Sequence, residues 1–417
     1  MIQTLHIVPE YNEELIYPAI CKSMEALNIA ADFRPEMKIV IKPNLVMAKS
    51  PDFPATTHPL VIKAVIRWLR EQGMQHITIA ESSGGLYNAE AMKHVYHVCG
   101  MDTLGEGAEL NMDFSAQTVN CPAGFKNHSF HLITPIVEAD YIINICKLKT
   151  HAMTGYSGGI KNLFGTIPGL EKPQMHYRWP EIEDFSNMLL ELAQTVAPNL
   201  TVIDAIDAME GNGPTGGTSH PLHMLLAAKD FYTQDCFAAK LMGLEPTEIV
   251  MLRQALEKGL VDFAVVTTPV ALKKPLQRIP LYSFREILIG GEEYAETASN
   301  KHCLQDLQDI PLIGIAPGSS TRELYTQYFM RHNLPFSPDM EVATTDQIFP
   351  MVQHNLGIGF FPEELAAEHI AQGKIVQIPI EEPLPERKIC LIRNVKRPQS
   401  IAARSLEEHL TSHRETE

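Results

Sequence analysis

Basic, imidazole and glycine residues are concentrated between Lys147 and His176, in the segment KLKTHAMTGYSGGIKNLFGTIPGLEKPQMH. If the chain stays extended from Lys147 to His151, then Lys147, Lys149 and His151 point to one side, because side chains alternate along a strand. Lysine ammonium groups can hold a phosphate, a carboxylate or a developing oxyanion. Imidazoles can transfer protons or bind a metal. We therefore expect a site for a small anionic molecule, with a metal or a phosphorylated cofactor as candidate cofactors.

A serine and two glycines precede a predicted helix in the same segment. Glycines let backbone N–H groups approach a ligand, and the N-terminus of a helix favours negative charge. The alternative is that the lysines are solvated and the glycines only form turns. For the cluster as a whole we favour function, since ligands gather at the carboxyl ends of parallel strands. The predicted residues are catalytic Lys149 and His151, a metal ligand His176, and cofactor-binding Lys147, Ser157, Gly158, Gly159, Lys161 and Asn162.

Three other predicted strand ends place polar residues on the same rim. Lys42 and Asn44 follow a strand over residues 37–41, two positions apart and so on one face. Glu81 follows a strand over 76–80, and Asp204 follows one over 200–203. Capping and turn chemistry is the alternative for all of them. We predict Glu81 as an acid/base or a lysine partner, and Lys42, Asn44 and Asp204 as cofactor-binding residues.

The elements that must position these residues alternate in type. Strand patterns at 37–41, 76–80, 141–146 and 200–203 alternate with helix patterns at 60–72, 89–98 and around 185–196. Thr57 and Pro59 have the residue types of a helix start. This alternation favours an α/β fold with a mainly parallel sheet. A helix over 246–259 leads into a second series, with strands at 262–267, 287–289, 312–315, 357–361 and 388–392. We predict two domains, 1–259 and 260–417.

Composition limits the partners. The chain has 34 Lys and Arg against 50 Asp and Glu, a net charge of −16, which repels nucleic acid and anionic membranes. No apolar run approaches the roughly 18 residues of a membrane span, and the start of the chain does not resemble a secretory signal. The seven cysteines are scattered without CxxC spacing, so they form no iron–sulfur or zinc motif and fit a reducing compartment. We expect a cytoplasmic protein; a homo-oligomer or a redox partner stays open.

The region from about residue 36 to 260 resembles the domain of unknown function 362 family, which is often iron–sulfur-associated. The resemblance rests on Lys42-Pro-Asn44, Glu81-Ser, Lys147-Leu-Lys-Thr-His151, Ser157-Gly-Gly-Ile-Lys-Asn-Leu-Phe-Gly165, His176, and Asp204 through Gly-Asn-Gly-Pro214. Many relatives carry a ferredoxin module with clustered cysteines. This chain has no such cysteines, so the resemblance implies no iron–sulfur cluster within it.

The same stretch resembles, more distantly, the lactate racemase family of nickel-pincer enzymes. In that family a catalytic histidine precedes a GG-x-K loop, whose lysine holds the cofactor, and a later histidine binds nickel. The resemblance implies these roles for His151, Lys161 and His176. The family's second catalytic histidine has no counterpart, because Glu81-Ser-Ser stands in the comparable loop. The resemblance thus implies a shared fold and pocket position rather than racemisation through two histidines.

From about residue 250 to the end, the chain resembles the substrate-binding (effector-binding) domain of LysR-type regulators, a periplasmic-binding-protein type II-like α/β fold. The features that carry this are Lys258-Gly-Leu-Val-Asp262, Ser319-Ser-Thr-Arg322, Gly357-Ile-Gly-Phe-Phe-Pro362 and Ile401-Ala-Ala-Arg404. The family implies that hydroxyls of Ser319, Ser320 and Thr321 hold an anionic effector. The helix-turn-helix and the first strand and helix of the effector domain are missing, so we expect a partial domain that binds no operator DNA.

Three functions remain open at this point. The first is an enzyme or cofactor-binding protein that acts on a small anion through the Lys/His/Gly site, as a metal- or cofactor-dependent oxidoreductase or isomerase. The second is a small-molecule sensor that uses the LysR-like domain. The third is a fusion in which neither site works.

Overall fold

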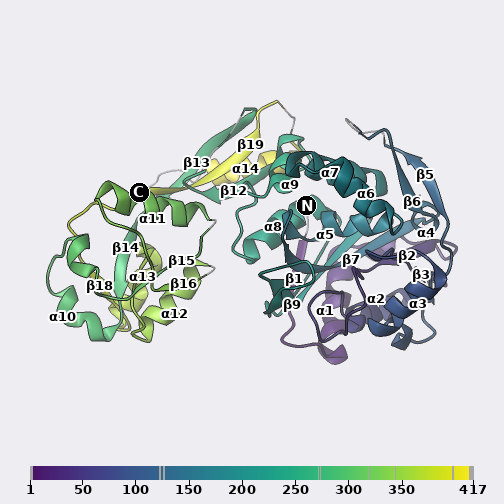
Figure 1. The fold of residues 1–417 in the computed structure, drawn as a ribbon, viewed down its shortest axis with the longest axis horizontal. Helices are drawn as coiled ribbons and strands as arrows, with labels where there is room; N and C mark the ends of the chain where they lie inside the picture. Colours follow the sequence, from purple (N-terminus) through teal and green to yellow (C-terminus); the bar gives the residue numbers. More distant parts are fainter. Residues whose placement is uncertain are drawn as a thin grey trace. The chain divides into compact units, whose positions relative to one another are not determined.

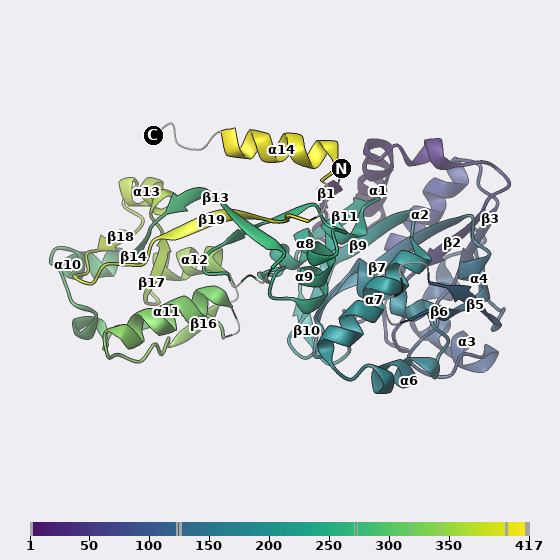
Figure 2. The same ribbon diagram turned by 90° about the horizontal axis from the view of Figure 1, so that it is seen from above.

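The computed structural model of the 417-residue chain describes residues 3–121, 124, 127–270, 272, 274–317, 319–342, 344–396 and 399–412. The chain divides into two compact units (Figures 1 and 2). The first unit consists of Met1–Ala239 and Glu248–Ala255, and the second of Lys240–Thr247 and Leu256–Glu417. Helix α9 (Val250–Glu257) lies at this transition, and the boundary after residue 259 stays a proposal. None of the helices in the described ranges is long and apolar enough to cross a membrane.

The first unit is built on one mixed sheet with a parallel centre. Its strand order is β1 (Gln3–Ile7), β11 (Met224–Ala228), β9 (Leu200–Glu210), β7 (Tyr141–His151), β2 (Lys38–Lys42), β3 (His76–Ile79) and β4 (Glu109–Leu110). Strands β9, β7, β2, β3 and β4 are parallel to one another, whereas β11 is antiparallel to both β9 and β1. Short strands β8 (Gly155–Ser157) and β10 (Thr218–His220) pair with β7 and β9, and β5 (Ala116–Asn120) forms a separate pair with β6 (Ser129–Ile133).

Helices cover both faces of this sheet (Figure 1). One face carries α1 (Glu13–Ala26), α2 (Pro59–Glu71) and α3 (Ala89–Val98), whose apolar sides share a core with Ile39, Ile41, Ile77 and Ile79. The other carries α5 (Gly159–Asn162), α6 (Glu171–Arg178) and α7 (Ile182–Val196), followed by α8 (Phe231–Leu241); α4 (Thr134–Val137) is a single turn. Apolar residues at helical spacing in α2, such as Val61, Val65 and Leu69, bury the face expected from the sequence.

The beginning of α2 differs from expectation in a way that matters for the site. Thr57 does not cap the helix. His58 does, accepting a hydrogen bond at Nδ1 from the Leu60 N–H (3.2 Å). Thr57 Oγ1 instead donates to the Ile145 carbonyl (2.8 Å) and accepts from the Asn44 N–H (2.9 Å). The start of α2 therefore fixes the backbone of the loop that follows β2.

The second unit contains two sheets. The larger has the order β16 (Met340–Val342), β15 (Leu312–Ile315), β17 (Ile358–Pro362), β14 (Glu286–Gly290) and β18 (Val376–Ile378). The smaller is antiparallel, with β19 (Arg387–Asn394) between β12 (Phe263–Thr267) and β13 (Leu276–Phe284). The helices of this unit are α10 (Ala295–Ala298), α11 (Ser320–Arg331), α12 (Ile348–Gln353), α13 (Glu363–Ala371) and α14 (Ile401–Ser412). The α/β class predicted from the sequence is confirmed in both units.

Candidate functional site

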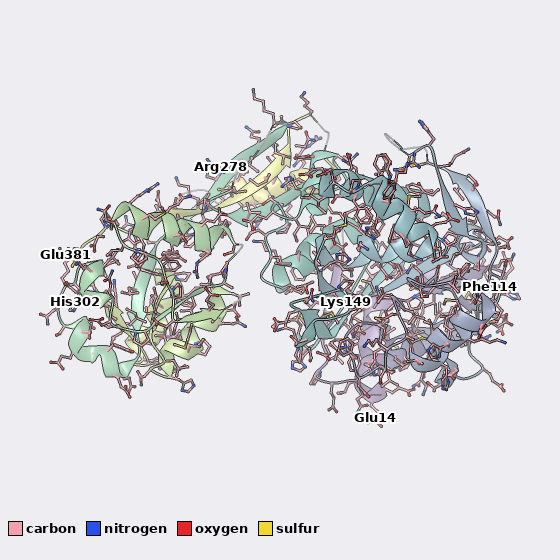
Figure 3. The ribbon with its side chains drawn as sticks, in the orientation of Figure 1. Glu14, Phe114, Lys149, Arg278, His302 and Glu381 are labelled. Atoms are coloured by element: carbon pink, nitrogen blue, oxygen red, sulfur yellow. The ribbon has the colours of Figure 1, made fainter. Side chains whose placement is uncertain are left out.

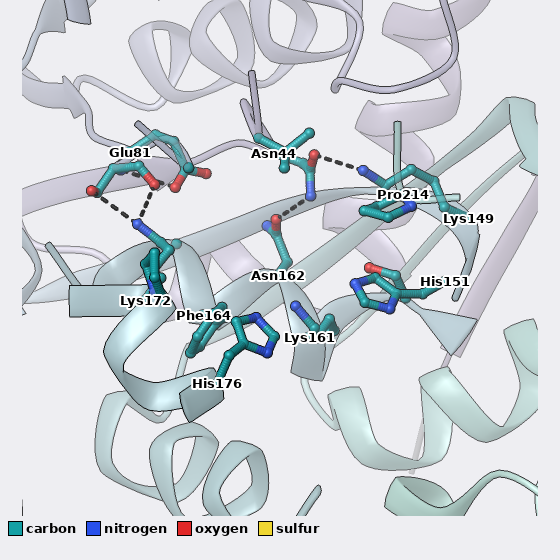
Figure 4. Close-up of a pocket in the computed structure, with 16 residues that line it drawn as sticks. Asn44, Glu81, Lys149, His151, Lys161, Asn162, Phe164, Lys172, His176 and Pro214 are labelled. Carbon is teal, nitrogen blue, oxygen red and sulfur yellow. Dashed lines mark hydrogen bonds between the residues drawn. The ribbon is translucent and has the colours of Figure 1, made fainter. Parts of the chain in front are cut away.

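A pocket of about 230 Å³ opens at the carboxyl ends of β2, β3 and β7 in the first unit (Figure 4). Ligands favour this edge of a parallel sheet. Eight predicted residues line the pocket: Asn44, Glu81, Lys149, His151, Ser157, Lys161, Asn162 and His176. The lining also includes Val46, Ser82, Gly84, Phe164, Gly165, Lys172, Pro173 and Pro214. The volume lies below the roughly 300–1,000 Å³ of pockets for drug-sized ligands, so it suits a small molecule.

Lys161 on α5 extends an ammonium group into this pocket. Its Nζ lies 4.7 Å from the ring centre of Phe164 and 5.8 Å from that of Phe185. Within the ranges that the structure describes, its Nζ makes no hydrogen bond and no ion pair. Burial, together with the nearby Lys42 ammonium, lowers the pKa of Lys161 to about 8. The two aromatic faces stabilise the cation, but its hydrogen-bond donors are left for a ligand.

Two imidazoles flank Lys161 in Figure 4. His151 Nδ1 accepts from the N–H groups of Met153 (3.2 Å) and Thr154 (3.3 Å), which assigns the neutral tautomer with hydrogen on Nε2. Burial and the neighbouring lysines lower the pKa of His151 to about 3, so at neutral pH it serves as a neutral hydrogen-bond donor. His176 stacks on Phe185 at 4.4 Å between ring centres, and burial, then Lys161, lowers its pKa.

Lys149 on β7 belongs to a chain of amide hydrogen bonds. Its Nζ donates to Asn44 Oδ1 (3.1 Å) and to the Ala55 carbonyl (2.8 Å). Asn44 Nδ2 donates to Asn162 Oδ1 (2.9 Å), and Asn162 Nδ2 donates to Asn144 Oδ1 (2.7 Å). Burial, then the ammonium groups of Lys161 and Lys147, lowers the pKa of Lys149 to about 7. Lys149, labelled in Figure 3, is buried.

The opposite wall of the pocket holds a carboxylate between two amines. Glu81 Oε2 pairs with Lys42 Nζ at 2.7 Å, and both side chains are buried. Burial raises the pKa of Glu81 and lowers that of Lys42, while their mutual attraction opposes both shifts. Lys172 donates to the Ile167 carbonyl and to three oxygens of Ser82 and Ser83, at 2.7–3.0 Å. Burial lowers the pKa of Lys172 to about 7.

Lys172 is a pocket residue that the sequence prediction omitted. It stands four positions before His176 on α6, and this spacing puts both residues on the same helix face. The signal was therefore present within the segment already singled out. With Lys149 and Lys161 it makes three amines in the pocket wall that have no carboxylate in an ion pair with them among the described residues.

Five predicted cofactor-binding residues lie outside the pocket lining. Lys42 is held by Glu81, as described above. Lys147 Nζ pairs with Asp204 Oδ2 at 2.8 Å, with both side chains buried. The register of β7 against β9 shifts between Lys147, which pairs with Asp204, and Lys149, which pairs with Met209, so the extra residues lie in β9. The two ammonium groups reach different neighbours.

The glycine pair differs from the prediction for another reason. The N–H groups of Gly159 (2.7 Å) and Ile160 (2.9 Å) donate to the carboxylate of Asp235, which occupies the N-terminus of α5. A Cβ on Gly158 would stand 2.1 Å from the Tyr156 hydroxyl and 2.5 Å from Asp235 Oδ1. The expected use of these amide groups for an external anion is therefore corrected: an internal carboxylate already fills this position. Asp235 lies 76 residues after Gly159, and no sequence signal connected them.

The charges around the pocket decide whether its residues could hold a metal ion. Within the described part of the chain, no group of three or more His, Cys, Asp or Glu side chains could hold a metal ion. The carboxylate of Glu81 is committed to Lys42, and the same lysine, Lys161, lowers the pKa of both imidazoles. The ammonium groups of Lys161 and Lys172 beside the two histidines repel a divalent cation, so the residues present do not fit a metal ion.

The second unit has a separate cavity of about 410 Å³, whose lining includes the predicted Ser319, Ser320 and Thr321. Ser319 caps α11 by accepting from the Arg322 N–H (3.1 Å). Thr321 Oγ1 accepts from Arg387 Nη2 (2.9 Å), and Arg387 also pairs with the buried Glu286 (3.0 Å). The sequence prediction omitted Arg387, because only the pairing of distant strands brings it to this loop.

Comparisons with known proteins agree with this arrangement. Residues 39–240 match the family model "Domain of unknown function (DUF362)", and residues 244–415 match "LysR substrate binding domain". The chain therefore contains a region that matches the DUF362 model, followed by a region that matches the LysR substrate-binding model. The resemblances to the DUF362 family and to the LysR substrate-binding domain are confirmed, and so is the fold class, with its periplasmic-binding-protein type II-like second half. The more distant resemblance to the lactate racemase family stays a prediction.

Individual proteins match parts of the chain. It is 29% identical over 265 residues to the thylakoid-associated protein sll1697 of Synechocystis sp., which covers 63% of this chain and 78% of that protein. It is 22% identical over 214 residues to the hydrogen peroxide-inducible genes activator of Haemophilus influenzae, over 49% of this chain and 69% of that protein. A similar solved structure is the CcmR regulatory domain of Synechocystis with 2-PG, at 16% identity and TM-score 0.35, covering 40% of this chain and 79% of that one. Another is the effector-binding domain of QuiR with shikimate, at 19% identity and TM-score 0.35, covering 39% and 76%.

Proposed function

We propose that the DUF362 domain binds a small organic anion, carrying a carboxylate or a phosphate, in the pocket around Lys161. The observation that carries this proposal is the Lys161 ammonium group, which enters the pocket without an oxygen partner among the described residues. Lys161 is partly buried, and taking a cation even partly out of water is unfavourable unless something pairs with it. An anion would supply that pair, and His151 Nε2 would donate a second hydrogen bond to it.

The rest of the wall supports the same ligand class. Lys172 adds positive charge to the wall, and Phe164 offers an apolar surface for the body of the ligand. The carboxylate of Glu81 is neutralised by Lys42, so it repels an anion less than a free carboxylate would. A phosphorylated cofactor or a carboxylate substrate shares this chemistry, and both are tested by the same experiment.

The test is thermal unfolding and calorimetric titration with oxalate, pyruvate, lactate, inorganic phosphate and a phosphorylated sugar. We expect at least one anion to raise the unfolding temperature of the native chain, and Lys161→Met to abolish that rise. Lys93→Met is the matched control, because Lys93 is an exposed lysine on α3, and it should respond like the native chain. Equal stabilisation of both variants, or stabilisation by none of the anions, would overturn the proposal and favour a non-catalytic fusion.

A second candidate function is sensing by the LysR substrate-binding domain. The specific observation is the cavity of about 410 Å³, where Thr344 and Thr345 add hydroxyls to those of Ser319, Ser320 and Thr321. Hydroxyl groups beside the guanidinium of Arg387 suit a small anionic effector. We expect Thr321→Ala to abolish the stabilisation by such an effector while leaving the oxalate response of the DUF362 domain unchanged. A response that survives Thr321→Ala would place the effector elsewhere.

A further inference from the structure

Lys149 has an unusual set of partners for a lysine buried in a pocket wall. Its side chain is 1% exposed, and both of its acceptors are neutral: the Asn44 amide oxygen and the Ala55 carbonyl oxygen. A buried ammonium group normally has a carboxylate beside it, as Lys42 and Lys147 do in this same domain. The surroundings of Lys149 therefore suit a neutral amine better than a cation.

The orientation of the Asn44 side-chain amide is set by a backbone carbonyl, through the side-chain amides of two other asparagines. Asn144 Nδ2 donates to the backbone carbonyl of Gly159 (3.0 Å), so its oxygen must face Asn162. Asn162 then donates to Asn144 and accepts from Asn44. This leaves the Asn44 oxygen, an acceptor only, facing Lys149. The backbone carbonyl thus sets the direction of every hydrogen bond in the chain up to the lysine.

A neutral amine has two N–H bonds and one lone pair. The Asn44 and Ala55 oxygens accept the two N–H bonds of Lys149, so the lone pair takes the remaining position, on a side chain that lines the pocket. The pKa of about 7 agrees with this state, since burial and neighbouring ammonium groups both favour the free amine. An amine activated in this way is a nucleophile toward carbonyl compounds.

We propose that Lys149 forms a Schiff base with the carbonyl carbon of a small 2-oxo acid, while Lys161 holds the carboxylate of that acid. The inference rests on the anion site proposed above and names its substrate class. Lys161 is the carboxylate partner because two phenyl rings stabilise it as a cation. Lys172 is excluded as the nucleophile, because four oxygens lie within hydrogen-bond distance of its Nζ, more than the two N–H bonds of a neutral amine can serve.

The step needs no oxidant and no added reactant. The Lys149 nitrogen bonds to the carbonyl carbon, the carbonyl oxygen takes a proton, and a carbinolamine forms. The carbon–oxygen bond then breaks, and the hydroxyl leaves as water with the second nitrogen-bound proton, leaving a carbon–nitrogen double bond. His151 Nε2–H can donate to the oxygen as its negative charge develops, because this imidazole is held neutral.

Borohydride trapping tests the proposal directly on the native full-length chain. The protein is incubated with pyruvate or glyoxylate near pH 7.5, roughly the pKa of the amine, and then reduced with borohydride. Peptide mapping by mass spectrometry should place one adduct on Lys149, in at least tenfold excess over exposed Lys93. Lys149→Met should lose the adduct, and Lys161→Met should need about tenfold more pyruvate to form it on the same residue. An adduct on Lys161, or labelling of Lys149 no greater than that of Lys93, would overturn the proposal.

A parallel measurement separates this proposal from the anion site on which it rests. Oxalate has two carboxylates and no ketone or aldehyde carbonyl, so it can occupy the pocket without forming an imine. If oxalate stabilises the native chain through Lys161 and no adduct forms with pyruvate, then only the Schiff base is refuted. If oxalate has no effect either, the anion site itself is refuted. Mapping the native chain needs no variant, so misfolding of Lys149→Met would not remove the test.

Discussion

Anion binding to the DUF362 domain should weaken as the pH rises, and the pKa of Lys161 sets where this happens. In the ligand-free pocket this pKa is about 8, and a bound carboxylate returns it toward the ordinary value for lysine, near 10.4. Binding therefore takes up a proton at any pH between these two values. The sign follows: the affinity is highest below about pH 7, where the lysine is already charged.

The magnitude follows from the fraction of charged lysine. A group with a pKa of about 8 is about nine-tenths protonated at pH 7 and about 3% protonated at pH 9.5. The dissociation constant for oxalate should thus rise about 30-fold over that interval, or about 2 kcal/mol of binding free energy. Lys172, with a pKa of about 7, can only steepen the slope, because it also loses a proton in this range.

Isothermal titration of oxalate at several pH values measures this slope, and buffers of different ionisation enthalpy count the protons taken up. Lys161→Arg is the matched variant, because a guanidinium group stays charged throughout this range. With Lys161→Arg, the binding of each oxalate should take up one proton fewer over this pH range. An affinity that is independent of pH between about 7 and 9.5, or a slope that Lys161→Arg leaves unchanged, would refute the assignment of Lys161 as the anion partner.

Three further predictions concern stability. Lys161→Met should raise the unfolding temperature of the ligand-free chain by about 2–4 °C, since it removes a partly buried cation that has ring contacts but no carboxylate partner among the described residues. Asp204→Asn should lower the unfolding free energy by about 3–5 kcal/mol in urea titration, because it leaves the ammonium group of Lys147 buried without a charge partner. Gly165→Ala should cost about 1–3 kcal/mol, because its Cβ would stand 1.9 Å from Glu81 Oε1.

Two of these variants have a control. Gly85→Ala meets nothing nearer than the Ser83 hydroxyl at 4.0 Å and should unfold like the native chain. Adding Lys147→Met to Asp204→Asn should restore part of the lost stability, since neither charge is then left alone. Additive losses in that double variant would show that the pair contributes no coupling. A lower unfolding temperature for Lys161→Met would mean that the protein already satisfies this ammonium group.

The sequence predicted the positions of the strands better than their lengths. Strand β7 was expected over residues 141–146 and β9 over 200–203, whereas each runs for 11 residues. The expected ends fall before Lys147 and Asp204, because charged residues normally end a buried strand. Here the two charges pair with each other at 2.8 Å, so the strands continue with both side chains buried. The two charges stand 57 positions apart in the sequence, and each offsets the desolvation cost of burying the other. A local sequence pattern cannot show such a pairing.

Whether a feature of the pocket could be predicted depended on how far apart in the sequence its interacting residues lie. The cluster of Lys149, His151, Lys161 and His176 could be predicted, because one short segment supplies all four residues. The role of the glycine loop could not, because the carboxylate of Asp235 comes from a distant helix and occupies the amide groups first. The direction of the amide chain was equally hidden from the sequence.

The partners of each lysine separate the structural amines from the functional ones. Lys42 and Lys147 each have one buried carboxylate at 2.7–2.8 Å, and such pairs complete the interior without needing a ligand. Lys149, Lys161 and Lys172 line a cavity with no carboxylate in an ion pair with them among the described residues, and burial lowers the pKa of all three. The chain has more Asp and Glu than Lys and Arg, with a net charge of −16. The lack of a carboxylate beside these three lysines therefore does not come from the composition. Lys161 and Lys172, the charged amines among the three, lack a counter-charge, which opposes folding, and an anionic ligand is the simplest group that would remove that cost.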